Sequence, residues 1–502
     1  MNHFRICFLV AMIALLNVPA FTQADQIAPN PNPAGNTISI NTSDATNNED
    51  FKNHGTLQIG NLGTLTNLDY GAVTNYGTLN NSGTLISMNY EIGNVPFTQL
   101  LNYGTLNNIS GGMVDSERMF NYNTLINYSG ASMLVLWFDN SSGATITNYG
   151  KLYQILDLPL PERPTGFSNA GIIYNYGSLS YSEMHNSGTI YNTGSLNPSY
   201  LYFYLDNTGT LTNSGNFSYT GHDVYNYGIL NNSGTIEART SELEWVSSRF
   251  YNLNILDNSG TLLNDDEYGI VSNSGTLINS GILINNGIGL DLPSLLGKSG
   301  LTNNGTLINS GSLINNGFMG GGGTYIQTAG QTINNGDITQ GLIAISGGSL
   351  NGTGTINSDV IIGSGASVNP GNSTGTLIIN GPLNSSGDFY FDIAGLLSGE
   401  YDVLIINGSA TFTGGNVQFD FINGYHASVG NYWDFLFANS ISGWDTLDFS
   451  VNGLDAGVSW RILGIDGGKR FLITPLPTTI WLLAPGLLGL AAIRRKFKKH
   501  PK

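Results

Sequence analysis

The chain has one cysteine and few charged side chains. Only 10% of its 502 residues are charged, whereas an ordinary soluble domain carries about 25%. The cysteine, Cys7, lies in an apolar run near the N-terminus, so the rest of the chain has no disulfide framework and no cysteine-based zinc site. The few histidines have no partner at a metal-ligand spacing. We therefore expect no enzyme, no cofactor, no bound metal and no catalytic residue, and stability must come from backbone pairing and stacking.

Positive charge is scarce except near the two ends. The net charge is −17, yet seven of the 17 basic residues are Arg5 or lie within residues 494–502. The residues between carry 10 basic against 34 acidic side chains, a net charge of −24. An acidic surface of this size repels nucleic acid and anionic lipid, so no nucleic-acid partner is expected.

Residues 1–24 have the order of a secretory signal peptide. Arg5 is followed by the apolar run 6–16 and then by a region with small residues. Eleven apolar residues are too few to span a bilayer, which argues against a membrane anchor. We expect export through the inner membrane and cleavage after Ala20 or Ala24.

Residues 475–502 combine three features in a fixed order. A short proline motif precedes the apolar run 478–493, and a basic cluster follows it. A run of this length barely spans a bilayer, and basic residues beside it favour the cytoplasmic side. The physical interpretation is a chain that is exported N-terminal end first and held by a C-terminal transmembrane helix.

These features resemble the PEP-CTERM sorting signal of Gram-negative bacteria, in its Pro-Leu-Pro variant. Leucine stands where the family usually has glutamate between the prolines, which departs from the strict motif. The resemblance implies processing by an exosortase, a transpeptidase-like membrane enzyme, in bacteria that make exopolysaccharide; a plain tail anchor is the alternative. The matching residues are Pro475, Leu476, Pro477, Arg494, Arg495 and Lys496.

Short units ending in Asn-x-Gly-Thr-Leu repeat from about residue 53 to residue 317. In the stretch 301–317, Leu, Asn and Gly occupy alternate positions and repeat every six residues. The period of two places them on one face of an extended chain, and short strands at a fixed interval indicate a solenoid. Leu then fills the interior, inward Asn amides bond the coils above and below, and Gly permits corners with positive φ. Three such sides make an 18-residue coil, which matches the gap from Gly287 to Gly305.

The second half contains Pro-Gly-Asn-Ser at 370–373 and Tyr-Asp-Val-Leu at 401–404. This part resembles the end of autotransporter-type β-helical passengers, which implies a parallel β-helix and a surface role. We therefore predict an all-β fold, a parallel β-helix (β-solenoid) with a C-terminal β cap, between a signal peptide and a transmembrane helix. A β-sandwich needs longer strands and gives no six-residue period. Loops or bulges are expected at 133–138, 156–166 and 237–246.

The expected domain organisation follows these boundaries. Its segments are 1–24, signal peptide; 25–52, low-complexity linker; 53–319, Asn/Gly/Leu repeat solenoid; 320–424, autotransporter-like module; 425–474, β cap rich in Trp and Phe; and 475–502, sorting signal. The glycine run 320–323 is expected to mark a join between modules.

Tyrosines of the Asn-Tyr-Gly units alternate with inward residues, so they should point outward. Such rings either stack on sugar faces, for example of exopolysaccharide, or stack on the neighbouring coils and stabilise the fold. The candidates are Tyr76, Tyr103, Tyr149, Tyr176 and Tyr227.

Two acidic groups are candidates for weaker roles. Asp265, Asp266 and Glu267 form a triplet that could hold Ca²⁺ through carboxylate oxygens, although such a run is more often a solvated loop. A second set matches positions that look structural in the autotransporter-type motif; it consists of Asp388, Asp392 and Asp402.

Three functions are compatible with the sequence. The first is a structural or adhesin-like protein of the cell surface or extracellular matrix, sorted by its tail. The second is a polysaccharide-active β-helix enzyme, which requires carboxylates gathered in one groove. The third is a sugar- or calcium-binding module. Sparse carboxylates favour the first.

Overall fold

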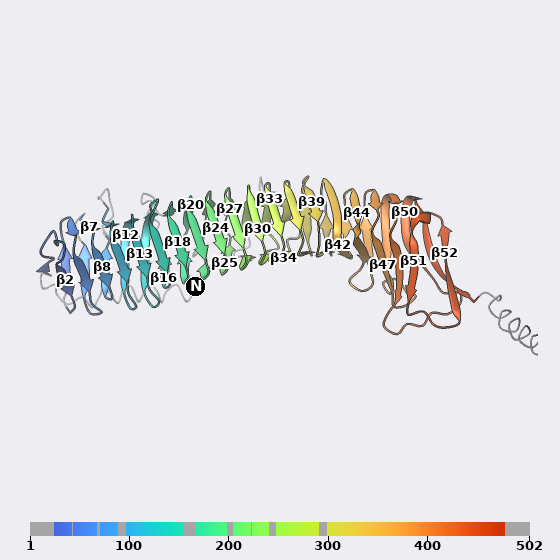
Figure 1. The fold of residues 1–502 in the computed structure, drawn as a ribbon, viewed down its shortest axis with the longest axis horizontal. Helices are drawn as coiled ribbons and strands as arrows, with labels where there is room; N and C mark the ends of the chain where they lie inside the picture. The colour runs from blue at the N-terminus through green and yellow to red at the C-terminus, as the bar shows by residue number, and fades with distance from the viewer. Residues whose placement is uncertain are drawn as a thin grey trace, which may run out of the picture. The chain divides into compact units, whose positions relative to one another are not determined.

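The computed structural model describes residues 25–42, 44–67, 71–88, 97–154, 166–197, 204–221, 223–239, 247–290 and 299–476. These residues form β-strands, most of them four residues long, and contain no α-helix. Two compact units divide the chain, one of residues 1–224 with 228–230 and one of residues 225–227 with 231–502. Within each unit successive coils lie side by side in chain order, and each strand pairs with a strand of the next coil (Figure 1). The expected all-β, parallel-strand solenoid is therefore confirmed at this level.

The two expected targeting segments lie outside the described residues. They are the signal peptide, 1–24, and everything in the tail after Leu476, which includes Pro477, the apolar run and the basic cluster. Within the described part of the chain, no helix is long and apolar enough to cross a bilayer.

The first unit is built from coils of parallel strands. β8 (Thr78–Asn81) pairs in parallel with β11 (Thr105–Asn108), and Leu79 faces Leu106 in the next coil. Both leucines are fully buried, whereas Thr and the third residue of each strand face outward. The alternation that the period of two predicts is thus present, and leucines form the interior.

Residues 133–138, which we expected to form a loop or bulge, instead belong to the nine-residue strand β14 (Ser132–Asn140). Met133, Val135 and Phe138 point into the core of the coil. The alternation is interrupted at Leu136 and Trp137, which are both half-buried, and pairing with β12 (Met113–Asn121) skips Leu136, so the irregularity lies within one strand. Of the other expected interruptions, 155–165 and 240–246 lie outside the described residues.

The second unit continues the same pattern with an 18-residue coil. Strand β36 (Thr306–Asn309) pairs with β39 (Thr324–Gln327), so that Thr306 lies beside Thr324. The expected coil length is present, but the register inferred from the glycines is wrong. Gly305 contacts Gly275 and Gly317 contacts Gly287, because the insertion after Gly287 lengthens that coil.

The parallel pairing of strands also continues on both sides of the glycine run 320–323. Strand β35 (Gly300–Asn303) pairs with β38 (Phe318–Gly320), which ends at the first glycine of this run. Pairing resumes immediately after it, with Thr324 beside Thr306. The glycines therefore turn a corner within continuous coils.

Corner glycines are required for close approach between coils. A Cβ on Gly104 would lie 2.1 Å from the carbonyl oxygen of Gly77 in the preceding coil. Neither residue has positive φ, so these two glycines do not serve backbone conformation, whereas Gly111, Gly130 and Gly143 at other turns of the first unit do have positive φ, as expected. Any side chain here would collide with backbone, so the stacking distance itself selects glycine.

Inward asparagines form a buried amide ladder in the first unit. Each Nδ2 donates to the Oδ1 of the asparagine in the next coil, over 2.7–2.8 Å. Most of these amides donate their second proton to a backbone carbonyl, as Asn75 does to Thr105. The ladder satisfies polar groups that would be costly to bury alone, which confirms the predicted inward role. Its members are Asn32, Asn53, Asn75, Asn102, Asn121, Asn140, Asn169, Asn186 and Asn207.

Strand direction changes near the C-terminal end of the described residues. β50 (Tyr432–Ser442) pairs in parallel with β48 (Val403–Phe412) but antiparallel with β53 (Gly468–Pro475). Trp433 is buried here, and its indole N–H donates to the carbonyl of Gly395 over 2.7 Å. An antiparallel strand with aromatic packing covers the edge that a further parallel coil would otherwise extend.

Candidate functional site

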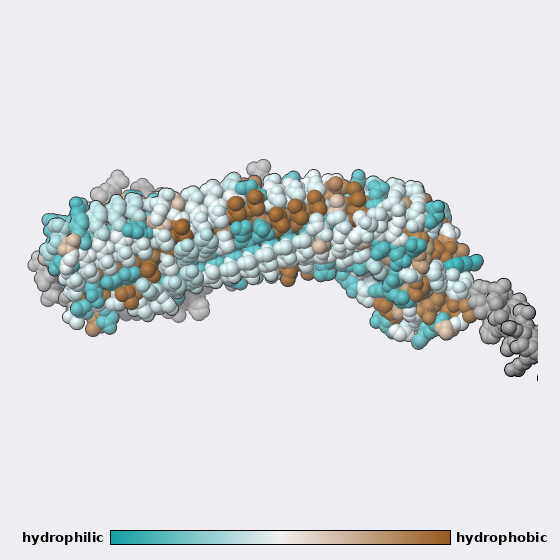
Figure 2. All heavy atoms as spheres, in the orientation of Figure 1, coloured by the Kyte–Doolittle hydropathy of each residue, from teal (hydrophilic) through white to brown (hydrophobic). Residues whose placement is uncertain are grey.

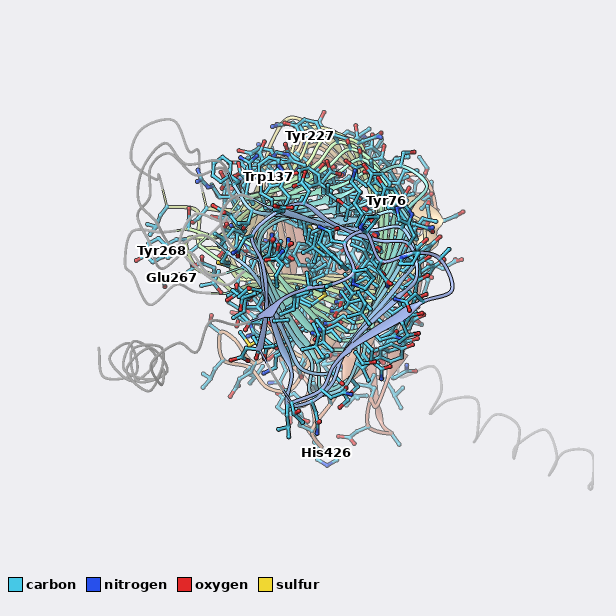
Figure 3. The ribbon with its side chains drawn as sticks, turned by 90° about the vertical axis from the view of Figure 1, so that its left-hand side faces the viewer. Tyr76, Trp137, Tyr227, Glu267, Tyr268 and His426 are labelled. Carbon is cyan, nitrogen blue, oxygen red and sulfur yellow. The ribbon has the colours of Figure 1, made fainter. Side chains whose placement is uncertain are left out.

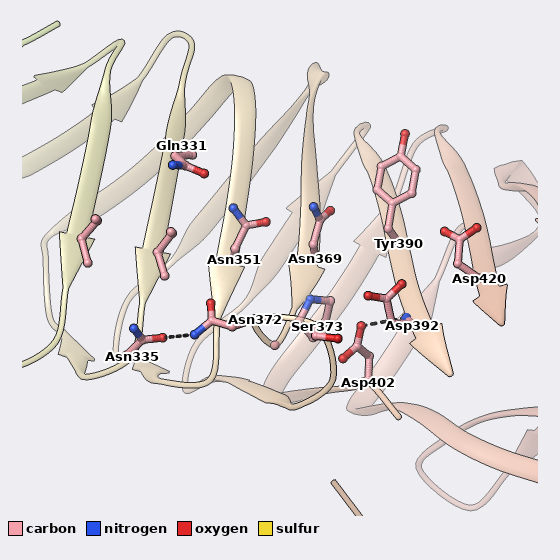
Figure 4. A pocket seen from close by; sticks show the side chains of 14 residues that line it. Gln331, Asn335, Asn351, Asn369, Asn372, Ser373, Tyr390, Asp392, Asp402 and Asp420 are labelled. Atoms are coloured by element: carbon pink, nitrogen blue, oxygen red, sulfur yellow. Dashed lines mark hydrogen bonds between the residues drawn. The ribbon is translucent and has the colours of Figure 1, made fainter. Parts of the chain in front are cut away.

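A polar groove of about 700 Å³ lies on the outer face of the second unit (Figure 4). Its lining contains amides, carboxylates, a phenol and two isoleucines, and no lysine or arginine. The strands that carry it are β37 (Ser312–Asn315), β40 (Gln331–Asn334), β42 (Leu342–Gly352), β44 (Val360–Pro370), β47 (Asp388–Ile393) and β49 (Asn416–Phe421). The lining residues used below are Ile314, Ile333, Asn335, Asn351, Asn369, Asn372, Ser373, Tyr390, Asp392, Asp402 and Asp420.

Strand register places the groove residues in a column. Ile314 lies beside Ile333, Ile333 beside Asn351, and Asn351 beside Asn369. All four alternate with buried residues, so they face outward. Apolar side chains gather over the preceding region, β30 (Ile255–Asn258) to β39, as Figure 2 shows. The column therefore changes from apolar to polar as it enters the groove.

Asp402 fixes one wall of the groove. Its two carboxylate oxygens accept hydrogen bonds from the backbone N–H groups of Gly375 and Asp392, each over 2.8 Å. The side chain is buried, and this burial raises the pKa of Asp402 to about 8 against the effect of the two N–H donors. Asp402 thus ties the loop that follows β44 to strand β47, the structural role that its sequence context implied.

Two further carboxylates lie side by side in the groove. Asp392 on β47 pairs in register with Asp420 on β49. Burial, and then the charge of Asp420, raises the pKa of Asp392. Asp420 accepts hydrogen bonds from the side-chain amides of Gln418 and Asn452. The groove therefore offers hydrogen-bond acceptors on two adjacent strands.

Asparagine amides complete the lining. Asn372, in the loop after β44, donates to Asn335 over 2.8 Å (Figure 4). Asn335 in turn donates to Asn316, and Asn316 to Asn286. The Oδ1 of Asn369 is buried and has no hydrogen-bond partner within the protein. An exterior amide row thus ends at the groove, next to an acceptor that still lacks a donor.

The five candidate tyrosines lie outside the coils, as expected, and each residue is 40–49% exposed. Those with close ring neighbours stack on other coils: Tyr76 and Tyr103 have ring centroids 5.2 Å apart, and Tyr149 and Tyr176 4.9 Å apart. The ring faces within each stacked pair are therefore covered. Tyr227, labelled in Figure 3, stacks beside Tyr225. Stacking of tyrosine rings between coils is therefore confirmed. Sugar stacking stays a prediction, and a sugar could contact only the ring edges and the outer rings of each stack.

The acidic triplet does not converge on one point. Asp266 is buried and accepts hydrogen bonds from the backbone N–H groups of Ser248 and Tyr268, and burial raises its pKa. Asp265 is exposed and accepts from Asn286, and Glu267 is exposed on the outside of the coils (Figure 3). Across the described residues, no group of three or more His, Cys, Asp or Glu side chains could hold a metal ion.

The remaining predicted residues are only partly described. Asp388 accepts a hydrogen bond from the backbone N–H of Asn416 over 2.8 Å, a structural contact. Pro475 ends β53, is exposed, and lies opposite Val458; Leu476 follows it. The other sorting-motif residues, Pro477, Arg494, Arg495 and Lys496, lie outside the described part of the chain.

Comparison with protein-family models finds no match, and comparison with curated proteins finds none either. Function must therefore be argued from the site itself. Sequence reasoning named Asp392 and Asp402 but missed Asn351, Asn369, Tyr390 and Asp420 as groove residues. The available signal was the period of two continued past residue 340, which places these side chains on the outer face.

Proposed function

We propose that the protein is an exported structural, adhesin-like component of the cell surface or extracellular matrix of a Gram-negative bacterium. The observation that carries the proposal is the buried amide ladder, in which inward asparagines form hydrogen bonds from each coil to the next. An architecture of this kind suits a stable scaffold that presents its outer faces to other molecules, with exopolysaccharide as the expected partner. The order of features in residues 1–24 and 475–502 supports export and sorting.

The proposed sorting step uses an exosortase that recognises the proline motif. Pro475 is exposed at the end of β53, so an enzyme can approach the motif while the coils stay folded. The apolar run 478–493 holds the chain in the inner membrane until processing. The basic residues after it stay on the cytoplasmic side.

Cell fractionation of the producing bacterium tests this proposal. A variant that lacks residues 477–502 keeps β53 whole, and a matched control lacks only residues 498–502 and keeps every motif residue. We expect the full chain and the control in the surface or matrix fraction, with the larger truncation lost from it. Identical location and processing of all three would refute the sorting step.

A second candidate function is cleavage of a polysaccharide. It is favoured by the neighbouring carboxylates of Asp392 and Asp420, on strands that lie about 4.7–4.9 Å apart. Carboxylate pairs carry out glycoside hydrolysis, one as acid and one as nucleophile or base, and the raised pKa of Asp392 suits an acid. Release of new reducing ends from a polysaccharide, abolished in Asp392→Asn, would support this candidate.

A further inference from the structure

The groove of the second unit has the dimensions of a site for an extended chain. Its column of Ile314, Ile333, Asn351 and Asn369 crosses four neighbouring strands. Since parallel strands lie about 4.8 Å apart, the column is about 14 Å long. The volume of about 700 Å³ is also large enough for an oligomer of small units.

The chemistry of the lining favours a ligand that donates many hydrogen bonds. The carboxylates of Asp392 and Asp420 offer oxygen atoms that can accept hydrogen bonds, and the buried Oδ1 of Asn369 lacks a donor within the protein. A buried polar atom without a partner destabilises the fold, so a ligand hydroxyl that donates to Asn369 would remove this cost. The carboxylates repel anionic ligands such as uronates and phosphates.

Apolar surface in the same groove narrows the class of ligand. Ile314 and Ile333 lie at one end of the column by strand register. The Tyr390 ring stands beside the carboxylates of Asp392 and Asp420 (Figure 4). A sugar ring has apolar C–H faces and hydroxyls at its edge, so it can contact both kinds of surface at once. Aromatic rings contribute to such contacts through their faces.

A peptide fits this groove less well. Extended peptides commonly bind by adding a strand to an open sheet edge. Here β42 pairs with β39, β40 and β44, and β44 pairs with β42, β46 (Leu383–Ser385) and β47. The floor of the groove therefore offers side chains but no strand edge.

We propose that this groove binds a segment of a neutral or amine-bearing polysaccharide. Tyr390 packs against a sugar ring, and Asn369, Asp392 and Asp420 accept hydrogen bonds from hydroxyl or ammonium groups. The loop that begins at Pro370, tied down by Asp402 and by the Asn372–Asn335 hydrogen bond, closes one side of the site. This inference does not depend on the sorting signal, and it makes the groove the attachment point between protein and glycan.

Retention of the purified full-length chain on immobilised polysaccharides tests the proposal. The probes are dextran, xylan, cellulose and chitosan, with alginate as the anionic comparison and polylysine as the peptide comparison. We expect retention on at least one neutral or amine-bearing polysaccharide, at least about tenfold stronger than on alginate. Tyr390→Ser and Asn369→Ala should each weaken it about five- to tenfold.

Matched variants separate binding from folding. Tyr149→Ser removes an outward tyrosine of the first unit and should leave retention unchanged, whereas Tyr390→Phe keeps the ring and should retain most of the binding. Equal unfolding temperatures of Tyr390→Ser and Tyr390→Phe show that any difference arises in the groove. The proposal is overturned by no retention on the four polysaccharides, by equal retention on alginate, by retention on polylysine alone, or by unchanged binding of both groove variants.

Discussion

The side-chain amide of Asn75 donates to the Oδ1 of Asn102, 27 residues later in the chain, over 2.8 Å. The side-chain amide of Asn102 donates in the same way to the Oδ1 of Asn121 over 2.7 Å. All three side chains are fully buried. Each amide is thus donor to one coil and acceptor from another, and the register between coils depends on this exchange.

Replacing Asn102 with Ala should therefore destabilise the first unit by about 1–3 kcal/mol, because it leaves the Oδ1 of Asn121 buried without this donor. The matched control is Asn107→Ala, which removes an outward asparagine bonded to Asn80; we expect at most about 0.5 kcal/mol there. Amide hydrogen exchange of the flanking strands measures both effects. Equal losses in the two variants would contradict the importance of the buried ladder.

Steric contact at the corners gives a second prediction. Gly104→Ala places a Cβ 2.1 Å from a backbone oxygen, and the displacement of packed backbone should cost about 1–3 kcal/mol. Gly464→Ala is the control, since its Cβ would meet no atom within 4 Å. Thermal unfolding should separate the two variants clearly. If both unfold like the original chain, coil spacing does not select glycine.

Stacked tyrosines should stabilise the first unit. The ring of Tyr103 lies 5.2 Å from that of Tyr76 and 4.4 Å from that of Tyr122. Tyr103→Ser should reduce the free energy of unfolding by about 0.5–1.5 kcal/mol for each stacked pair lost. Denaturant unfolding measures this loss. A neutral substitution would show that these rings contribute little, and would leave sugar stacking as the better explanation of their outward placement.

Asp402 makes stability depend on pH. Its pKa, raised to about 8, exceeds the ordinary value near 3.9, so the folded chain keeps a proton that the unfolded chain releases above about pH 4. Stability from this group is therefore fully present below pH 4 and is lost as pH rises to about 8. Asp402→Asn should remove this part of the pH dependence. It should also cost about 1–3 kcal/mol, because an amide cannot accept from both backbone N–H groups.

Unfolding temperatures of the two chains between pH 4 and pH 9 measure this effect. Because other buried carboxyls such as Asp392 and Asp266 also have raised pKa values, the difference between the chains is the quantity to compare. Parallel curves would mean that Asp402 is charged throughout the range.

The coils could be predicted because the alternation of inward and outward residues involves only neighbouring positions in the sequence. In Leu79 and Asn81, the period of two identified inward side chains directly, and the six-residue unit indicated three sides per coil. Register could not be read the same way. The chain between Gly287 and Gly305 has the length of one coil, yet an insertion places Gly305 beside Gly275, and spacing alone does not distinguish a coil from an insertion.

The groove could be predicted only in part. Asp392 and Asp402 lie in a recognisable motif, but Ile314 and Asp420 reach the same groove from strands about 100 residues apart. Their proximity depends on every corner and insertion between them. A pattern of outward residues can therefore suggest a polar face, while the register that assembles a site requires the structure.

The central claim, that this is an exported and sorted surface protein, is tested most directly by determining both ends of the chain isolated from the producing cells. Mass spectrometry of terminal peptides from the surface or matrix fraction should find a start after Ala20 or Ala24 and an end that lacks Arg494 to Lys502. A chain in the cytoplasmic fraction that retains both Met1 and Lys502 would contradict the account.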